Sequence, residues 1–511
     1  MRLRVGFVRI AAALLIVYGA GFAWPVRGWA QGTMQEAVEE LIREREYDMR
    51  GLGIVVKDLE RDSILVAINP DSMMNPASVQ KLVTAAAAIE LLGLHHVIPT
   101  RIYIDDSNYN PDTGIVRGNM YIMGRGDPGL TGEKIWRLVQ NLRHNGIRRV
   151  TGDLIIDNTF FDDVGVGPGF SERESRAYQS LISALMPSFS SIGIHHRPGA
   201  VPGSPVHIDI FPKIDGIVIE NTATTVGGAR GRIDIATELR RGVTHVVVKG
   251  TMGIEEQPTY THRRLWQTWQ AFGGAFRAVS AESGLRIDGR TVRRAVPDSL
   301  INAGPFYTYG TEPVSEFVNL MLKWSSNYVS EMLFKTMGAR RRGEPGTWPK
   351  GVTAVADWWE SRELPGTPYI INGSGMGSVQ TRRNQSADSA SGQSATTRVR
   401  TENLMTASQT VALLSHVHRQ KNYYPEFLAA LPSAGVDGTL RSRFPRSRLR
   451  GIVRAKTGTL NSLRVSALAG YILLDNKTYA FAIFCNDTGS GQFDNWTFQE
   501  QVVELVAQEG W

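Results

Sequence analysis

The chain has 511 residues, of which 42% are hydrophobic and 21% are charged, a balance that excludes collagen-like and wholly disordered proteins. A chain of this length is expected to form about three domains, because one core rarely serves so many residues. The formal net charge of +7 falls to +3 without residues 1–30, which contain four arginines and no acid, so no nucleic-acid partner is indicated.

The N-terminus has the pattern of an export signal. Arginines precede an apolar run at residues 10–24, and small residues around Ala30 offer a cleavage site. The run is short for a bilayer-spanning helix, so a signal peptide over residues 1–30, cleaved after Ala30, is favoured over a retained membrane anchor. We therefore expect a periplasmic protein with no stable membrane span after cleavage.

The first elements after the signal are a helix, a strand pair and a second helix. Residues 34–46 have helical spacing, and residues 53–57 and 64–69 have the pattern of paired strands. The second helix opens at Pro76, is apolar nearly all round, and stops at Gly93. Such a helix is expected to lie buried at the centre of a domain.

The middle of the chain, residues 100–299, changes to short strand-like runs separated by Gly, Pro and Asp turns. This texture predicts one or two inserted, mostly β domains. A division into two subdomains is expected, the first formed by residues 100–205 with 270–299 and the second by residues 206–269.

Helical spacing returns beyond Pro313, and Ser325 and Asn327 fall where one helix gives way to the next. Residues 378–397 are almost entirely polar or small, so a mobile polar loop is expected there. The C-terminal part contains three strand candidates and a closing helix, at residues 451–458, 466–474, 478–485 and 496–508.

The sequence Ser78-Val79-Gln80-Lys81 supplies a nucleophile and a nearby amine on one helix face. A serine hydroxyl needs a base, and an uncharged lysine can take its proton; burial and a second cation, Lys456, both disfavour the charged amine. Alone, the pair also fits a helix cap and a solvated lysine. The apolar helix around Lys81 weakens that alternative, because a buried lysine needs a partner or a task.

The sequence Ser325-Ser326-Asn327 offers a polar relay. Ser325 can pass a proton to a leaving amine, and Asn327 can bind a substrate amide or hold Lys81 in place. Taken alone, this motif fits a polar surface turn equally well.

The sequence Lys456-Thr457-Gly458-Thr459 lies on a predicted strand and suits an anion clamp. Lysine attracts a carboxylate, threonine hydroxyls donate, and glycine admits a close substrate backbone. The N–H groups of Ser78 and Thr459 would converge on an oxyanion. The expected catalytic residues are Ser78, Lys81, Ser325, Asn327 and Lys456, the expected substrate-binding residues are Thr457, Gly458 and Thr459, and no metal or cofactor is expected.

With these motifs in this order, the chain resembles the penicillin-binding proteins, and most of all the class C, low-molecular-mass D-alanyl-D-alanine carboxypeptidase/endopeptidases. One departure is Asn372, where relatives usually have aspartate. Further resemblance lies in residues 124–128, 148–153, 198–199, 372–375 and 434–440.

The resemblance implies an α/β (α+β) fold of the penicillin-binding-protein and serine β-lactamase type, with an antiparallel sheet flanked by helices. It implies a discontinuous peptidase domain, residues 31–99 and 300–511, with the accessory region inserted between. It also implies that Ser78 attacks the bond between D-alanines in peptidoglycan stem peptides or a D-amino-acid crosslink, and that β-lactams acylate this serine.

Two alternatives remain at this point. A serine β-lactamase shares the core chemistry, but the long insertion argues against it. A catalytically silent peptidoglycan-binding scaffold is disfavoured because all the expected reactive side chains are present. The sequence makes no prediction of the oligomeric state.

Overall fold

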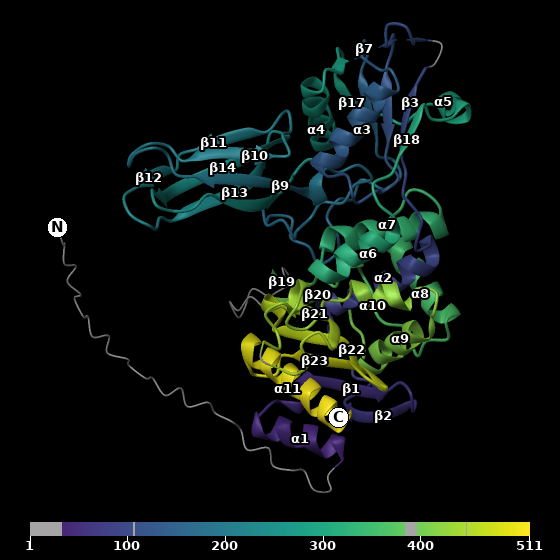
Figure 1. The fold of residues 1–511 in the computed structure, drawn as a ribbon, viewed down its shortest axis with the longest axis vertical. Helices are drawn as coiled ribbons and strands as arrows, with labels where there is room; N and C mark the ends of the chain where they lie inside the picture. Colours follow the sequence, from purple (N-terminus) through teal and green to yellow (C-terminus); the bar gives the residue numbers. More distant parts are fainter. Residues whose placement is uncertain (1–32, 106–107, 384–395, 446, 511) are drawn as a thin grey trace, which may run out of the picture.

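The computed structural model describes residues 33–105, 108–383, 396–445 and 447–510 (Figure 1). The predicted signal peptide lies outside these ranges. In Figure 1 the two ends of the chain together form the lower part, while the residues between them form an upper part and a lateral arm. No helix within the described ranges is both long and apolar enough to cross a membrane.

A five-stranded antiparallel sheet organises the lower part, in the order β2-β1-β23-β22-β21. Its first and last strands along the chain are direct neighbours, with Ile54 of β1 opposite Ile483 of β23. The large sheet is therefore built from both ends of the sequence. The strands are β1 (Leu52–Asp58), β2 (Ser63–Ile68), β21 (Val453–Leu460), β22 (Val465–Leu474) and β23 (Lys477–Asn486).

Helices cover both faces of this sheet. Ile54 and Val56 pack into the cluster that includes α1 and α11, while Val55 between them packs into the larger cluster with α2 and α9. Alternation along β1 therefore places two apolar layers on opposite sides of one sheet. The helices are α1 (Met34–Glu44), α2 (Lys81–Leu92), α9 (Ala407–Arg419) and α11 (Gln492–Gly510).

The predicted central helix begins with a short 3-10 turn, η2 (Ala77–Gln80), and continues as α2. Residues from Lys81 to Ile89 are all buried, and Gly93 ends the helix with a φ of 96°, which favours glycine. Three further helices pack against α2, namely α6 (Val314–Trp324), α7 (Asn327–Arg342) and α8 (Trp348–Ser361), and α10 (Tyr424–Ala430) packs on α6 and α9.

The upper part contains a mixed five-stranded sheet in the order β17-β8-β6-β3-β18. It has more helix than the sequence predicted, because α3 and α4 bury apolar faces against its strands. Strand β18 pairs with β3, so this sheet extends past residue 299. The elements are β3 (Thr100–Ile104), β6 (Met120–Met123), β8 (Leu154–Asp157), β17 (Thr291–Arg293), β18 (Tyr307–Tyr309), α3 (Gly132–His144), α4 (Trp269–Glu282) and α5 (Asp298–Ala303).

A small four-stranded sheet, β16-β7-β5-β4, lies in the same upper part. Strand β7 pairs in parallel with both of its neighbours, so that Val150 lies next to both Val116 of β5 and Ile287 of β16. The strands are β4 (Tyr109–Asn110), β5 (Ile115–Val116), β7 (Arg149–Val150) and β16 (Arg286–Ile287).

The arm consists of two sheets, β10-β9-β15 and β11-β14-β12 with β13 also on β14. Strand β9 begins at Ser191, earlier than the subdomain boundary expected at residues 205 and 206. The Gly- and Pro-rich stretch at residues 198–204 is a connection between paired strands and not a linker. The strands are β9 (Ser191–Arg197), β10 (His207–Phe211), β11 (Val218–Asn221), β12 (Thr224–Val226), β13 (Ile233–Arg240), β14 (Val243–Gly253) and β15 (Thr259–Arg264).

A mobile polar loop was expected at residues 378–397, but both ends of this segment form strands. Strands β19 (Ser378–Arg383) and β20 (Thr396–Thr401) pair as an antiparallel ribbon. Paired strands satisfy their backbone groups without apolar side chains, so a polar composition did not reveal them. The residues between the two strands, 384–395, lie outside the described ranges.

Candidate active site

Ser78 lies in the 3-10 turn that leads into α2, and a tight local geometry holds it there. The preceding residue, Ala77, has a φ of 44°, and its N–H donates to Asn75 Oδ1 at 2.7 Å. Asn75 is itself held from the sheet, because its N–H donates to Asn486 Oδ1 at 2.9 Å. The turn that presents the serine is therefore fixed against the C-terminal end of β23.

Lys81 is fully buried one turn after Ser78. Its ammonium nitrogen lies 2.9 Å from Ser78 Oγ, 2.8 Å from Asn327 Oδ1 and 2.7 Å from the carbonyl oxygen of Ser374. Burial lowers the pKa of Lys81 to about 7, although the more distant charge of Glu331 opposes that shift. A substantial fraction of this amine is therefore neutral near pH 7, in contact with the serine hydroxyl.

Ser325 and Asn327 lie at the junction between α6 and α7, as the sequence predicted. Ser325 ends α6 with a φ of 59°, and Ser326 caps α7 by accepting the N–H of Val329 at 3.3 Å. The sharp turn directs both functional side chains toward the lysines. Asn327 accepts from Lys81 through Oδ1 and donates through Nδ2 to the carbonyl of Tyr178 at 3.0 Å.

Lys456 is the second fully buried lysine of the site. Its Nζ donates to Ser325 Oγ at 2.9 Å and to the carbonyl of Thr457 at 2.8 Å. Burial and the nearby Lys81 hold the pKa of Lys456 well below its usual range. Neither lysine forms an ion pair with a carboxylate among the described residues, so an incoming anion would be favoured here.

Strand β21 forms one edge of the large sheet and offers its outer side to the cleft. The N–H of Ala455 donates outward, to the carbonyl of Pro432 at 3.0 Å, and not to β22. Alternate residues of a strand direct their N–H groups to the same edge, so Thr457 and Thr459 direct theirs outward too. This edge is suited to pair with an extended peptide.

Gly458 is required because β21 packs directly on the turn that carries the serine. A Cβ at this position would lie 2.7 Å from the carbonyl oxygen of Pro76 and 3.0 Å from the N–H nitrogen of Ser78. The glycine was predicted to admit a substrate backbone. The structure shows that a glycine here allows β21 to approach Ser78.

Glu331 and Trp348, which the sequence did not indicate, complete the surroundings of Lys81. Glu331 of α7 is fully buried, and its carboxylate accepts the N–H of Ser374 at 2.8 Å and that of Gly373 at 3.2 Å. Trp348 Nε1 donates to the same carboxylate at 2.7 Å. Glu331 thus fixes the backbone segment whose Ser374 carbonyl accepts from Lys81; only a tertiary contact reveals this role.

Asn372 precedes that segment and explains a departure from the expected aspartate. Its Nδ2 donates to the carbonyls of Pro168 and Met376, both at 2.8 Å, and its Oδ1 accepts the N–H of Gly375 at 2.8 Å. An ionised aspartate would place a carboxylate against two carbonyl oxygens. The amide instead ties the inserted region to the segment beside Lys81.

Thr439 is a third residue that was missed. The hydroxyl of Thr457 lies 2.7 Å from that of Thr439. The short segment around Thr439 is anchored by Asp437, which accepts from Lys323 Nζ at 3.0 Å. Residues 434–440 contributed only to the family resemblance, because no side chain in them suggested chemistry.

The arrangement as a whole suits nucleophilic attack by a serine with a lysine base. Lys81 is hydrogen-bonded to Ser78 and Asn327, and Lys456 is hydrogen-bonded to Ser325. The edge formed by Thr457, Gly458 and Thr459 lies beside Ser78. Within the described part of the chain, no three or more His, Cys, Asp or Glu side chains gather as metal ligands.

Known proteins match the chain over nearly its whole length. A family model described as the D-Ala-D-Ala carboxypeptidase 3 (S13) family matches residues 34–382 and 389–509. A D-alanyl-D-alanine carboxypeptidase of Actinomadura sp. is 27% identical over 466 residues, which cover 89% of this chain and 81% of the relative. The D-alanyl-D-alanine carboxypeptidase DacB of Haemophilus influenzae is 21% identical over 89% of each chain.

The solved structure of penicillin binding protein 4 from Haemophilus influenzae has a similar fold. It superimposes with a TM-score of 0.74 at 20% identity and covers 92% of this chain and 99% of the solved one. The same protein has been solved in complex with a β-lactam, and that structure superimposes with a TM-score of 0.68.

Proposed function

This chain belongs to the D-Ala-D-Ala carboxypeptidase 3 (S13) family and is a serine-type D-Ala-D-Ala peptidase, and we propose that Ser78 is its nucleophile. The observation that carries the proposal is the contact between Ser78 Oγ and the buried Nζ of Lys81 at 2.9 Å. An amine with a pKa lowered to about 7 accepts the serine proton at neutral pH.

The acylation step follows from this geometry. Ser78 Oγ attacks the carbonyl carbon of the penultimate D-alanine while its proton passes to the neutral Lys81 Nζ. The N–H groups of Ser78 and Thr459 stabilise the oxyanion, with a contribution of roughly 3 kcal/mol per donor. Collapse of the tetrahedral intermediate breaks the peptide bond, and the leaving amine takes a proton from the Ser325 hydroxyl, which Lys456 contacts at 2.9 Å. The proton that Lys81 received replaces the one lost from Ser325, so Lys81 is neutral again before deacylation.

Deacylation uses the same groups in reverse. Water attacks the ester carbonyl and gives a proton to Lys81, and the Ser78 oxygen leaves with a proton returned from that amine. If the amine of another stem peptide had been the leaving group, the same two steps would cleave a crosslink, which is the endopeptidase reaction.

The substrate's terminal carboxylate is recognised at Lys456 and the β21 edge. Lys456 is buried with hydroxyl and carbonyl oxygens but without a carboxylate among the described residues, so the substrate supplies the compensating charge. The Thr457 hydroxyl adds a hydrogen bond, held in position by Thr439. β-Lactams carry a carboxylate and a strained amide in a similar arrangement and acylate Ser78.

The physiological substrate is peptidoglycan, and we expect the enzyme to act in the periplasm after removal of residues 1–30. The family assignment supports peptide stems ending in D-alanyl-D-alanine as substrates.

The test is mass spectrometry of the mature protein incubated with penicillin, comparing wild type with Ser78→Ala. The wild type should gain one penicillin mass on the peptide that contains Ser78, and the variant should gain none. An unchanged adduct in Ser78→Ala would exclude this serine. Rapid turnover of a chromogenic cephalosporin by the wild type would instead favour a β-lactamase.

A further inference from the structure

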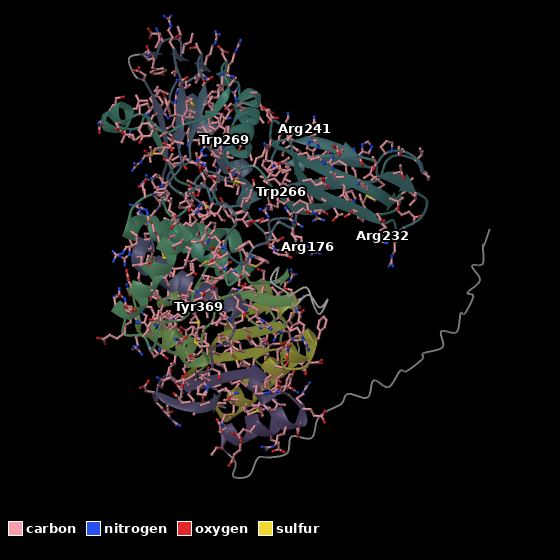
Figure 2. The ribbon with its side chains drawn as sticks, turned by 180° about the vertical axis from the view of Figure 1, so that it is seen from behind. Arg176, Arg232, Arg241, Trp266, Trp269 and Tyr369 are labelled. Carbon is pink, nitrogen blue, oxygen red and sulfur yellow. The ribbon has the colours of Figure 1, made fainter. Side chains whose placement is uncertain are left out.

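A cavity of about 320 Å³ lies where the arm joins the upper part of the molecule, outside the catalytic cleft. Two tryptophans line it, Trp266 after β15 and Trp269 at the start of α4. Figure 2 shows both residues at the base of the arm. Neither indole belongs fully to a core, because both remain partly exposed.

The indole of Trp266 is held in one orientation. Its Nε1 donates to Thr237 Oγ1 at 3.1 Å, and the guanidinium of the buried Arg264 covers the ring at 4.3 Å. A fixed aromatic ring costs little entropy when it receives a ligand.

Polar side chains complete the wall around these rings. Arg293 donates to Asn158 Oδ1 at 2.8 Å and pairs with Asp163, whose side chain is 70% exposed. Asn158 also donates to Ser183 Oγ at 3.1 Å. The cavity therefore combines aromatic faces with amide, carboxylate, guanidinium and hydroxyl groups.

This combination matches the chemistry of a sugar chain. The C–H faces of a pyranose ring are apolar and pack on indole rings, while its hydroxyl and N-acetyl groups need directional donors and acceptors. A charged ligand would leave the indole rings without an apolar partner, and a purely apolar ligand would leave the polar side chains without hydrogen bonds.

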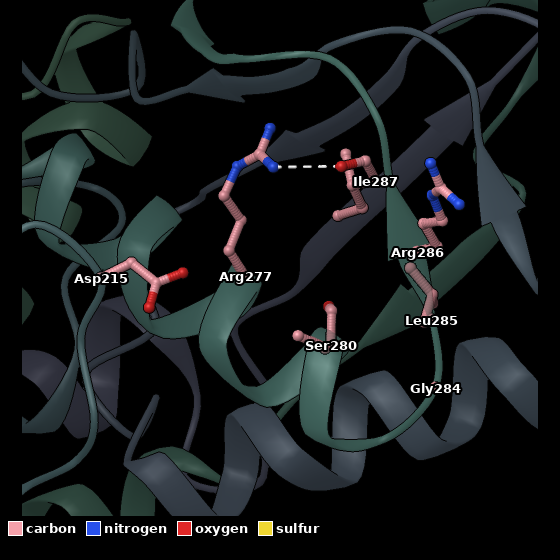
Figure 3. Close-up of a pocket in the computed structure, with 8 residues that line it drawn as sticks. Asp215, Arg277, Ser280, Gly284, Leu285, Arg286 and Ile287 are labelled. Carbon is pink, nitrogen blue, oxygen red and sulfur yellow. Dashed lines mark hydrogen bonds between the residues drawn. The ribbon is translucent and has the colours of Figure 1, made fainter.

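A second cavity, of about 380 Å³ between α4 and β16, is less suited to a ligand (Figure 3). Its most prominent charged group, Arg277, already donates to Thr291 Oγ1 at 2.7 Å and to the carbonyls of Ile287 and Gly289. No aromatic ring lines it.

The tryptophan-lined cavity is close enough to the catalytic site to act on the same substrate molecule. Ile182 lines the cavity, and Tyr178, four residues earlier, contacts Asn327 through its carbonyl. Four residues span at most about 14 Å, and an extended five-residue stem peptide spans roughly 17 Å. A glycan held in the cavity would therefore allow its own stem peptide to reach Ser78.

We propose that the cavity lined by Trp266, Trp269 and Asp163 binds the glycan of peptidoglycan, namely an N-acetylated amino-sugar segment whose stem peptide occupies the catalytic cleft. This inference rests on the proposed function for the choice of substrate. The arm thereby selects polymer-linked stems over free peptides.

Isothermal titration calorimetry with peptide-free glycan strands, stripped of their stems by an amidase, tests the proposal. The wild type should bind saturably, and Trp269→Ala should bind about tenfold more weakly, as expected for the loss of one stacked ring. The matched control is Trp136→Ala, which removes an exposed tryptophan of α3 outside the cavity and should leave the affinity unchanged.

An activity comparison separates this proposal from the proposed function. Trp269→Ala should release D-alanine from polymeric peptidoglycan several-fold more slowly than wild type, yet cleave a free peptide ending in D-alanyl-D-alanine at the wild-type rate. Absence of cleavage of the free peptide by the wild type would refute the proposed function only. Absence of glycan binding by the wild type, or equal binding by Trp269→Ala, would overturn the glycan site.

Penicillin labelling of each variant reports whether it is folded. If Trp269→Ala fails to label, Asp163→Ala takes its place, because that exposed side chain has little part in packing. Wild-type affinity for the glycan in a labelled Asp163→Ala variant would then overturn the proposal.

Discussion

In the described part of the chain, two regions bury lysine side chains completely, and they compensate the lysine charge in different ways. At the contact between α7 and the inserted region, Lys335 Nζ lies 2.5 Å from Asp162 and 4.2 Å from the centre of the Trp348 ring. In the cleft, Lys81 contacts only uncharged oxygens. Burial lowers the pKa of both amines, but a contacting carboxylate opposes the shift only for Lys335.

The comparison shows how the surroundings of Lys335 differ from those of Lys81, the proposed catalytic base. Both lie on helices, and both are inaccessible to solvent. A contacting carboxylate keeps the amine charged, and its absence allows the amine to be neutral and act as a base. The identity of the partner, and not burial itself, therefore determines the role.

Removing the base should have the largest effect. Lys81→Met is expected to lower the rate of acylation by penicillin roughly a thousandfold, because Ser78 loses its proton acceptor. Stopped-flow acylation measures the rate. Lys335→Met is the matched control, since it removes the buried lysine of the other region, and its folded fraction should acylate at nearly the wild-type rate. Similar losses in both variants would refute the distinction.

Giving Lys81 a carboxylate should make it resemble Lys335. Asn327 Oδ1 lies 2.8 Å from Lys81 Nζ, so the Asn327→Asp substitution would place a negative charge about this far from the amine. An opposite charge this close raises the pKa of a lysine by roughly 1 to 3 units, so acylation at pH 7 should fall about a hundredfold.

The pH profile of acylation gives the sign of this effect. The reactive form is the neutral amine, so the wild-type rate should rise with pH through a midpoint near 7 and be lost as pH falls below it. Asn327→Asp should move the midpoint upward, whereas Asn422→Asp, at an exposed position, should not move it. A midpoint that moves downward in Asn327→Asp would contradict the assignment of Lys81 as base.

Removing the carboxylate from the structural lysine should affect stability. Asp162→Asn leaves a buried ammonium without its charged partner and is expected to lower the free energy of unfolding by about 3 kcal/mol. Urea denaturation measures the change. The neighbouring Asp163→Asn should cost far less, because the Asp163 side chain is 70% exposed. Equal losses would mean that the Lys335 pair is not an important anchor.

The smallest effect is expected at Thr439. Thr439→Val removes the hydroxyl that lies 2.7 Å from that of Thr457, while preserving the side-chain shape. The KM for a peptide with a free terminal carboxylate should rise about fivefold with little change in kcat, as expected for one hydrogen bond. Thr353→Val, on the exposed side of α8, is the control. A change confined to kcat would contradict a role in carboxylate binding.

The sequence was most informative where chemistry depends on local spacing. Ser78 and Lys81 are three residues apart, so a helical turn brings them together wherever it lies in the fold. The helix junction at Ser325 and the three C-terminal strands were also predicted, because capping and turn residues mark them. The helices of the upper part and the ribbon of β19 and β20 were not predicted. The frequent Gly, Pro and Asp turns favoured a mostly β region over the helices, and the polar composition favoured a loop over the ribbon.

The sequence by itself determined which side chains are available for catalysis, since the three motifs contain the proposed nucleophile, the two lysines and the proposed carboxylate-binding residues. Only the tertiary structure decided that Lys81 is held by the Ser374 carbonyl and Asn327 by the Tyr178 carbonyl. Every residue carries a backbone carbonyl, so no residue type indicates these contacts. The charge state of a buried lysine likewise depends on which groups surround it in space, and for Lys81 those groups come from distant segments of the chain.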